Sequence, residues 1–293
     1  MPIKLAPSFL IFLFYVTIFG QNATEIYLFD LVKTEDNYVL KNPVNISNNK
    51  GFDNQPSFTE DGRAILFSSV RKGQMDIAQY EIFDDNRTWL TDTEANEFSP
   101  QSYPKKKKNF TAVRQETDGT QLLYKYSYKG KEPKVLIPNL KVGYYLWLNS
   151  KSLVSFVIGD IETLQVSDFK NKIKYPIQKN IGRSLQKIPY SMDIGSGLFS
   201  FISKDHEEPE IYAINPKTSD TKYLADPLPD SEDLTWTSDG TILMGNEDKV
   251  YKLKPGEDKN WSPIIIESDL PLKNITRLMV SPNGTKIAIV VDE

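Results

Sequence analysis

Seven polar residues that could bind a ligand stand at or just before short patterns typical of β-strands. Three are acids, two are arginines, and two carry an amide or a hydroxyl: Asp53, Gln55, Glu97, Ser99, Arg183, Asp233 and Arg277. Carboxylate and amide oxygens that converge on one point suit calcium, and a few polar groups around a concave surface suit a polar ligand. The alternative is that they are solvated loop residues or cap backbone groups in turns.

Other chemistry is largely excluded by residue type. The chain has no cysteine, which rules out disulfides, thiolate metal sites and a cysteine nucleophile. It has one histidine, His206, so a multi-histidine site within one chain is impossible. His206 is interpreted as an exposed loop residue, and Ser196, which lies between two glycines, lacks the strand–elbow–helix pattern of a hydrolase serine. We predict no catalytic residue and no cofactor, with a central calcium ion as the alternative.

Composition describes a folded protein that does not target nucleic acid. Apolar residues make up 39% and charged residues 25% of 293 residues, enough for a packed core. The net charge of −4 argues against nucleic acid, whose binding needs a basic face. The run Lys105–Lys108 is interpreted as a solvated hairpin tip. The aromatic residues are expected to pack between sheets rather than to stack on sugars. The sequence does not identify which of them are exposed, and Tyr144, Tyr145 and Trp261 are candidates.

The first twenty residues have the pattern of a secretory signal peptide. Lys4 precedes an apolar stretch over residues 8–19, and Gly20 follows it. The stretch is shorter than the ~20 residues that span a bilayer, although an uncleaved anchor is the alternative. We expect residues 1–20 to be removed and residues 21–293 to be secreted or periplasmic, without a transmembrane segment. Seven glycosylation sequons are interpreted as chance: Asn22, Asn45, Asn86, Asn109, Asn260, Asn274 and Asn283.

A repeat organises the rest of the chain. Each copy holds a short strand, a turn and an apolar strand, and four turns contain a dipeptide that favours positive φ: Asp61-Gly62, Asp118-Gly119, Asp239-Gly240 and Asn283-Gly284. One aromatic or apolar anchor marks each copy, at spacings of 45, 44, 43, 46 and 44 residues: Phe58, Tyr103, Trp147, Tyr190, Trp236 and Val280.

Two more strands follow each anchored hairpin. The third strands are predicted at Met75–Ile82, Gln121–Tyr128, Thr163–Phe169, Glu210–Ile214 and Lys249–Leu253. The fourth strands are predicted at Thr88–Thr91, Lys134–Ile137, Ile173–Ile177, Thr221–Leu224 and Pro263–Glu267. Four strands per repeat are typical of a β-propeller blade, and no long apolar period of 3.6 residues indicates a helix.

The two ends of the chain predict how the ring closes. The last hairpin is followed by no third or fourth strand, whereas Glu25–Leu31 and Tyr38–Ile46 look like such a pair. We therefore expect the N-terminal strands to complete the C-terminal blade, which removes open sheet edges. The predicted fold is an all-β, six-bladed β-propeller with four antiparallel strands per blade.

Two segments carry a family resemblance. Gln55–Phe67 and Glu210–Tyr212 resemble the repeats of six-bladed, WD-repeat-like TolB-type propellers, which read Pro-x-Trp-Ser-Pro-Asp-Gly-Lys, a hydrophobic strand and then Asp-Ile-Tyr. The resemblance covers nearly the whole chain after residue 20 and is weak in the blades anchored by Tyr103, Trp147 and Tyr190. It implies the fold, export and a binding role. TolB itself has an extra N-terminal α/β domain for which this chain has no room, so its specific envelope role does not carry over.

Three functions are compatible with these patterns. We favour a non-catalytic binding module of the bacterial envelope, a monomer that meets a protein, peptide or glycan at one face of the disc. The resemblance also leaves open a metal-dependent enzyme, because six-bladed folds host lactonases and lyases that work from a central site. The third is an accessory propeller of a separate peptidase. Fold alone does not decide among them.

Overall fold

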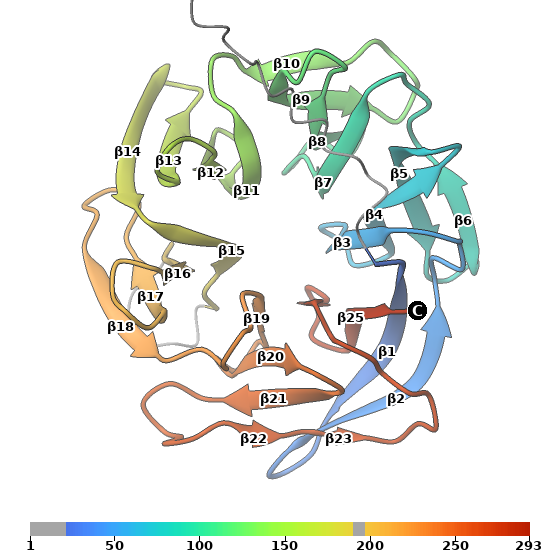
Figure 1. Ribbon diagram of the computed structural model, residues 1–293, viewed down its shortest axis with the longest axis vertical. Coiled ribbons are helices and arrows are strands. Elements are labelled where there is room, and N and C mark those ends of the chain that lie inside the picture. Colours follow the sequence, from blue (N-terminus) through green and yellow to red (C-terminus); the bar gives the residue numbers. More distant parts are fainter. Residues whose placement is uncertain (1–21, 190–196) are drawn as a thin grey trace, which may run out of the picture.

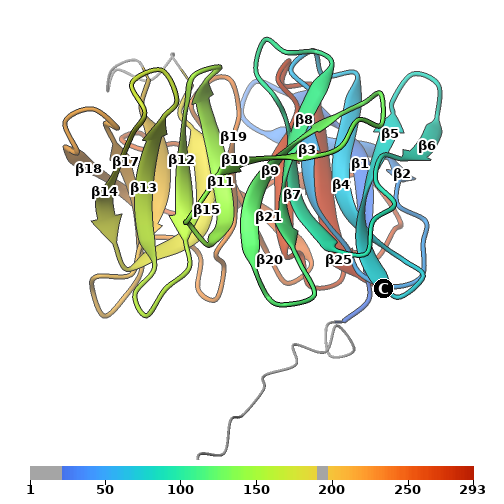
Figure 2. The same cartoon turned by 90° about the horizontal axis from the view of Figure 1, so that it is seen from above.

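Six sheets stand in a ring around a central axis in the computed structural model, which describes residues 22–189 and 197–293 (Figure 1). In the perpendicular view, the strands run between the two faces of a disc (Figure 2). The described residues form strands and turns and contain no helix, and thus none that could cross a membrane. The predicted all-β, six-bladed β-propeller is therefore confirmed. The proposed signal peptide lies outside the described residues.

The blades are numbered from the first complete sheet in the chain. Blade 1 contains β3 (Asp53–Phe58), β4 (Ala64–Arg71), β5 (Gln74–Glu81) and β6 (Asn86–Trp89). Blade 2 contains β7 (Asn96–Ser102), β8 (Asn109–Gln115), β9 (Gln121–Ser127) and β10 (Lys134–Ile137). Blade 3 contains β11 (Val142–Asn149), β12 (Ser152–Val157), β13 (Thr163–Asp168) and β14 (Ile173–Lys179).

The remaining blades follow the same plan, with the first strand of each blade nearest the axis (Figure 1). Blade 4 contains β15 (Ile181–Lys187), β16 (Phe199–Ser203), β17 (Glu210–Ile214) and β18 (Thr221–Ala225). Blade 5 contains β19 (Leu234–Trp236), β20 (Ile242–Asn246), β21 (Lys249–Leu253) and β22 (Ser262–Pro263). Blade 6 contains β24 (Arg277–Val280), β25 (Lys286–Asp292), β1 (Thr24–Lys33), β2 (Tyr38–Asn45) and β23 (Ile265–Ile266).

Blade 6 is shared between the two ends of the chain, as the sequence predicts. β1 lies between β25 and β2 and pairs with β25 in an antiparallel register that places Phe29 opposite Ile287. Phe29 is fully buried in a cluster with side chains of blade 5, such as Leu243 and Val250. The N-terminal strand therefore contributes both backbone pairing and core packing to the closing blade.

One predicted strand divides between two blades. The segment predicted as Pro263–Glu267 forms β22, which pairs with β21, and β23, which pairs in parallel with β2. Between them, Ile264 is buried, and its N–H donates to the carbonyl of Val250. Because this buried residue holds the chain against blade 5 while Ile265 reaches blade 6, the last sheet gains a short fifth strand.

The repeated anchors pack between blades. Five of them are buried in the described residues, and Tyr190 lies outside those residues. The two tryptophan anchors use the same polar contact: Trp147 Nε1 donates to Thr111 Oγ1 at 3.1 Å, and Trp236 Nε1 donates to Ser200 Oγ at 2.9 Å. A buried indole N–H needs such a partner, so each hydroxyl of the preceding blade fixes the ring of the next.

Candidate functional site

A cavity of about 530 Å³ lies where the innermost strands meet. Residues of β3, β7, β11, β15 and β24 line it, together with Asn22, Thr24 and Asp292 near the described ends of the chain. This space, which we call the axial cavity, therefore opens on the face that carries both of those ends. Its volume falls in the range of pockets that hold small ligands or ligand side chains.

Irregular pairing of the inner strands presents side chains to this cavity. The register shifts near Gln55 in β3, near Ser99 in β7 and near Gly143 in β11. Gln55 and Ser99 have positive φ angles of 59° and 50°. An extra residue of this kind bends the strand and redirects its side chains. The bulges therefore recur in the innermost strands of three consecutive blades, and Gln55, Gly143 and Tyr144 at or beside them line the axial cavity.

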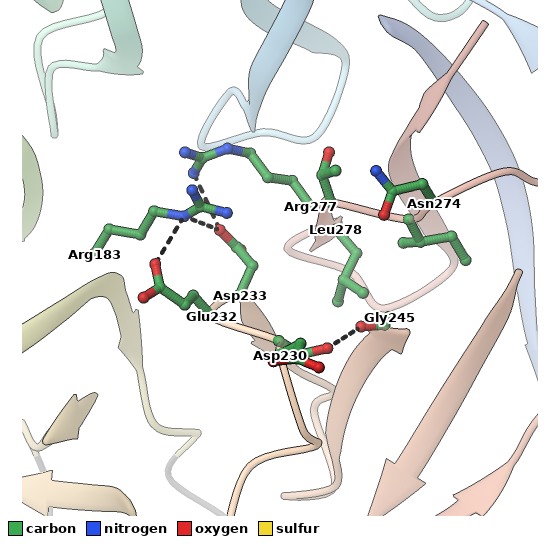
Figure 3. Close-up of a pocket in the computed structure, with 11 residues that line it drawn as sticks. Arg183, Asp230, Glu232, Asp233, Gly245, Asn274, Arg277 and Leu278 are labelled. Carbon is green, nitrogen blue, oxygen red and sulfur yellow. Dashed lines mark hydrogen bonds and ion pairs between the residues drawn. The ribbon is translucent and has the colours of Figure 1, made fainter. Parts of the chain in front are cut away.

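Two arginines and two acids form an ion cluster beside the axial cavity (Figure 3). Arg277 Nη1 lies 3.0 Å from Asp233 Oδ2, and Arg183 Nε lies 3.7 Å from the same oxygen. Arg183 Nε is also 3.9 Å from Glu232 Oε2, and Lys204 pairs with the other oxygen of Glu232. The acids and both arginines line a second, adjoining cavity of about 220 Å³.

Arg277 is held more tightly than Arg183. Its Nη2 donates to the hydroxyl of Tyr144 at 3.0 Å, and its guanidinium lies 5.0 Å from the centre of the Tyr144 ring. Burial alone would lower the pKa of Arg277, but the charge of Asp233 and the contact with Tyr144 more than offset it, so the pKa is raised. Burial raises the pKa of Asp233, against the opposing effect of the two arginines. The close pairing with Arg277 compensates for burying this carboxylate.

Arg183 keeps unused hydrogen-bond donors. Its contacts with Asp233 and Glu232 are longer than hydrogen bonds, and its Nε has no hydrogen-bond partner among the described residues. The side chain is 31% exposed and lines both cavities. A guanidinium carries five N–H donors in a planar fork, so Arg183 offers several of them to the open space.

The seven polar residues singled out in the sequence do not form one group. Arg183, Asp233 and Arg277 come together, and Gln55 lines the axial cavity. The amide oxygen of Gln55, however, accepts from the N–H of Ser99 at 2.7 Å and from the hydroxyl of Ser68 at 2.9 Å. These bonds join blades 1 and 2, so Gln55 supports the fold as well as the cavity wall.

Asp53 and Glu97 lie at two equivalent joints between blades, away from the lining of either cavity, and both are fully buried. At the first joint, Ser47 Oγ accepts from the N–H of Ile26 and donates to Glu25. The second joint repeats this arrangement with three other residues: Thr91 Oγ1 accepts from the N–H of Ile77 and donates to Asp76. Each joint thus places a hydroxyl-bound acid of one blade close enough to raise the pKa of the buried acid of the next, Glu25 for Asp53 and Asp76 for Glu97.

Burial raises the pKa values of Asp53 and Glu97 at these joints. It raises the pKa of Asp53 to about 7, and the nearby charge of Glu25 adds to the shift, whereas Ser69, Asn49 and Arg87 oppose it. It likewise raises the pKa of Glu97 to about 7. Asp76 adds to that second shift, and the opposing groups are Thr93, Thr91 and Arg114. Both carboxyl groups therefore serve as buried structural acids that take up a proton near neutral pH.

Replacing one buried acid should make stability less sensitive to pH. A carboxyl with a raised pKa in the folded state stabilises fully below its unfolded value of 3.8 and loses that contribution as pH rises through about 7. The free energy of unfolding of the wild type should therefore fall relative to Asp53→Asn, by at most about 1.4 kcal/mol per pH unit in this window. Urea unfolding from pH 4 to pH 8 measures the difference.

A matched control separates burial from the simple loss of charge. Asp118 is exposed, and hydrogen bonds from Thr120 lower the pKa of its carboxyl. The free energy of unfolding of Asp118→Asn should therefore not increase relative to that of the wild type as pH rises. A constant difference between the wild type and Asp53→Asn from pH 4 to pH 8 would contradict a raised pKa at Asp53.

The acids are not arranged as a shared metal site in the part of the chain that the structure describes. No group of three acidic, histidine or cysteine side chains there could hold a metal ion. Asp53 and Glu97 lie at separate joints, and Asp233 is engaged by two arginines. The calcium ion considered from sequence would therefore need other oxygen ligands.

The remaining sequence features lie on the surface or outside the description. His206 is exposed, with Nε2 3.4 Å from Glu210 Oε2. The four lysines of Lys105–Lys108 are exposed, and Lys106 lies over the ring of Tyr103. Ser196 lies outside the described residues. Of the unassigned aromatics, Tyr145 is buried and Tyr144 lines the axial cavity.

The fold is similar to those of solved structures, whereas the sequence matches no known family. No family model matches the chain. No curated protein is similar to it in sequence either. A protein described as TolB, from Agrobacterium tumefaciens, has a similar structure with a TM-score of 0.69 at 13% identity, over 94% of this chain and 99% of that one. The fold is that of the TolB-type six-bladed propellers.

Two further similar structures show how little this likeness says about function. TolB of Acinetobacter baumannii matches with a TM-score of 0.58 at 10% identity, over 92% of this chain and 65% of its own. A gluconolactonase of Xanthomonas campestris matches with a TM-score of 0.62 at 9% identity, over 94% and 98% of the two chains. Since a TolB-type fold is shared by proteins of different activity, function must be argued from the site.

Proposed function

We propose that this chain is a non-catalytic binding module whose ligand, a protein segment, peptide or glycan, inserts into the axial cavity. The observation that carries the proposal is Arg183, a partly exposed guanidinium with unused donors at the wall of a cavity that residues of five inner strands surround. A recognition site of this kind needs a few oriented polar groups in a concave surface.

The wall of the axial cavity is suited to recognition. Its lining includes the side-chain amides of Gln121 and Asn274, and an amide carries both donors and an acceptor. Arg277 is fixed by Asp233 and Tyr144, so the charge beside the cavity is pre-organised before a ligand arrives. Groups that are already in place cost less conformational entropy on binding.

The likeness to TolB structures supports the same class of function. We infer that the protein works in the bacterial envelope as a secreted or periplasmic monomer, after removal of residues 1–20. The expected partners are envelope proteins, peptides or glycans. The alternative, a metal-dependent enzyme of lactonase type, is favoured by the likeness to a gluconolactonase. Against it, Asp233 beside the cavity is engaged by arginines, and Asp292 on the cavity lining accepts hydrogen bonds from Asn22 and Asn274.

Filling the cavity should weaken binding. Thr276 lines it, and the hydroxyl of Thr276 makes no hydrogen bond to the described residues, so Thr276→Phe adds bulk without removing a polar contact. Peptide and glycan arrays should detect a ligand for the wild type, and its affinity should fall at least about tenfold in Thr276→Phe, the equivalent of about 1.4 kcal/mol. Unaltered binding by a folded Thr276→Phe would place the ligand elsewhere.

A further inference from the structure

We propose that the ligand of the axial cavity is a peptide segment that presents a carboxylate, and that Arg183 determines this specificity by binding the carboxylate. The inference rests on the proposed function and deepens it, because it names the chemistry that the site selects. It follows from three features of the site: the donors of Arg183, the placement of the acids, and the covered ring of Tyr144.

The donors of Arg183 are free where a ligand would arrive. The guanidinium has no hydrogen bond to any described residue, although its Nε is buried and two carboxylates lie 3.7 and 3.9 Å away. The terminal Nη groups belong to a side chain that is 31% exposed and have no hydrogen bond to a described residue. A planar carboxylate can accept two parallel N–H bonds from a guanidinium, so a ligand carboxylate would pair with these terminal donors rather than with the buried Nε.

The charges are divided in a way that favours an anion. Arg183 and Arg277 line both cavities, whereas Glu232 and Asp233 line only the smaller one. Asp292, an acid on the lining of the axial cavity, accepts hydrogen bonds from the side-chain amides of Asn22 and Asn274. In the axial cavity a ligand therefore meets two guanidinium groups and one hydrogen-bonded carboxylate.

Three aromatic residues line the axial cavity, Phe52, Phe98 and Tyr144. Of these, Tyr144 lies beside the arginines and does not offer an open sugar platform. The guanidinium of Arg277 lies over the Tyr144 ring, and Phe156 contacts that ring in an edge-to-face arrangement at 5.8 Å between centroids. Sugars bind aromatic side chains through an open ring face, and Arg277 already covers one face of Tyr144. The mixed amide donors and acceptors around the cavity instead suit the alternating N–H and C=O groups of a peptide backbone.

Calorimetry with unlabelled probes tests the proposal. The probes are N-acetylated, C-amidated hexaglutamate, the matched hexaglutamine peptide, and trigalacturonate as an acidic sugar. We expect hexaglutamate to bind at least about tenfold more tightly than hexaglutamine, in line with charge-assisted hydrogen bonds. Arg183→Gln should remove most of this preference, and Arg183→Lys, which keeps the charge without the fork, should remove part of it.

The matched control is Arg63→Gln. Arg63 is exposed in the turn that follows β3 and does not line the axial cavity. Its replacement by glutamine therefore removes the same charge as Arg183→Gln, but away from the cavity. Affinity for hexaglutamate should stay within about twofold of the wild type in this control. An equal loss in Arg63→Gln and Arg183→Gln would overturn the proposal in favour of general electrostatic attraction.

Three other results would also overturn it. They are equal affinity for the two peptides, no binding of hexaglutamate, and tighter binding of trigalacturonate that depends on Arg183. The proposed function fails separately, when the arrays yield no ligand or Thr276→Phe binds as the wild type does. A module that binds a neutral ligand in the cavity would therefore retain the function and lose only the carboxylate specificity.

Discussion

Phe29→Ala is expected to lower the free energy of unfolding by about 3–5 kcal/mol, the usual cost of deleting a buried phenylalanine ring. Phe29 belongs to the N-terminal strand β1 but is fully buried against side chains of blade 5 and of the C-terminal strands. The loss is a large share of the 5–15 kcal/mol by which folded domains are typically stable. Urea or guanidinium unfolding of the two proteins at one pH measures it.

The same substitution on the surface provides the control. Phe83 is 97% exposed, so Phe83→Ala should change the free energy of unfolding by less than about 0.5 kcal/mol. If Phe29→Ala were as mild as Phe83→Ala, the N-terminal strand would not be packed in the closing blade. The ring would then have to close in another way.

Arg277→Leu is expected to destabilise the protein by about 3–5 kcal/mol, because it leaves the carboxylate of Asp233 buried without its close partner. The Asp233 side chain is only 10% exposed, and the remaining cation, Arg183, is 3.7 Å away. Loss of Arg277 also frees the hydroxyl of Tyr144. Chemical unfolding measures the effect, with the exposed Arg63→Leu as a control that should change little.

A double-mutant cycle identifies the cause of this loss. If the buried charge dominates, adding Asp233→Leu to Arg277→Leu should recover part of the stability, with a coupling of about 0.5–3 kcal/mol between the two positions. Additive losses from the two single substitutions would show that the ion pair contributes little. The destabilisation by Arg277→Leu would then come from altered packing around Tyr144.

The architecture could be predicted because the repeat fixes it many times over. Evenly spaced anchors, glycine turns and third strands of similar sequence recur from blade to blade along the chain. Three strands, β10, β17 and β21, begin and end at the predicted residues. The division of Pro263–Glu267 between two sheets could not be predicted. It depends on where the buried Ile264 finds space between blades, a property of the assembled ring.

The site was only partly predictable, because strand bulges decide which residue faces the axis. Asp53 and Glu97 occupy comparable places in the repeat, yet both are buried between blades. Tyr144 was named only among the unassigned aromatics and not as a site residue, although it stands three residues before its anchor, as Gln55, Asp233 and Arg277 do. That shared position was the one signal in the sequence that could have found it. The pairing of Glu232 with Lys204 joins a loop to the end of a strand and left no local pattern.

The most direct test of a ligand site in the axial cavity is side-chain NMR of the arginines. The chain has six, so the Nε–Hε spectrum should be simple: Arg63, Arg71, Arg87, Arg114, Arg183 and Arg277. During titration with the tightest ligand from the arrays, we predict that the signals of Arg183 and Arg277 shift together and saturate while the others stay in place. Saturating shifts confined to the other four arginines, with Arg183 and Arg277 unmoved, would contradict binding in the axial cavity.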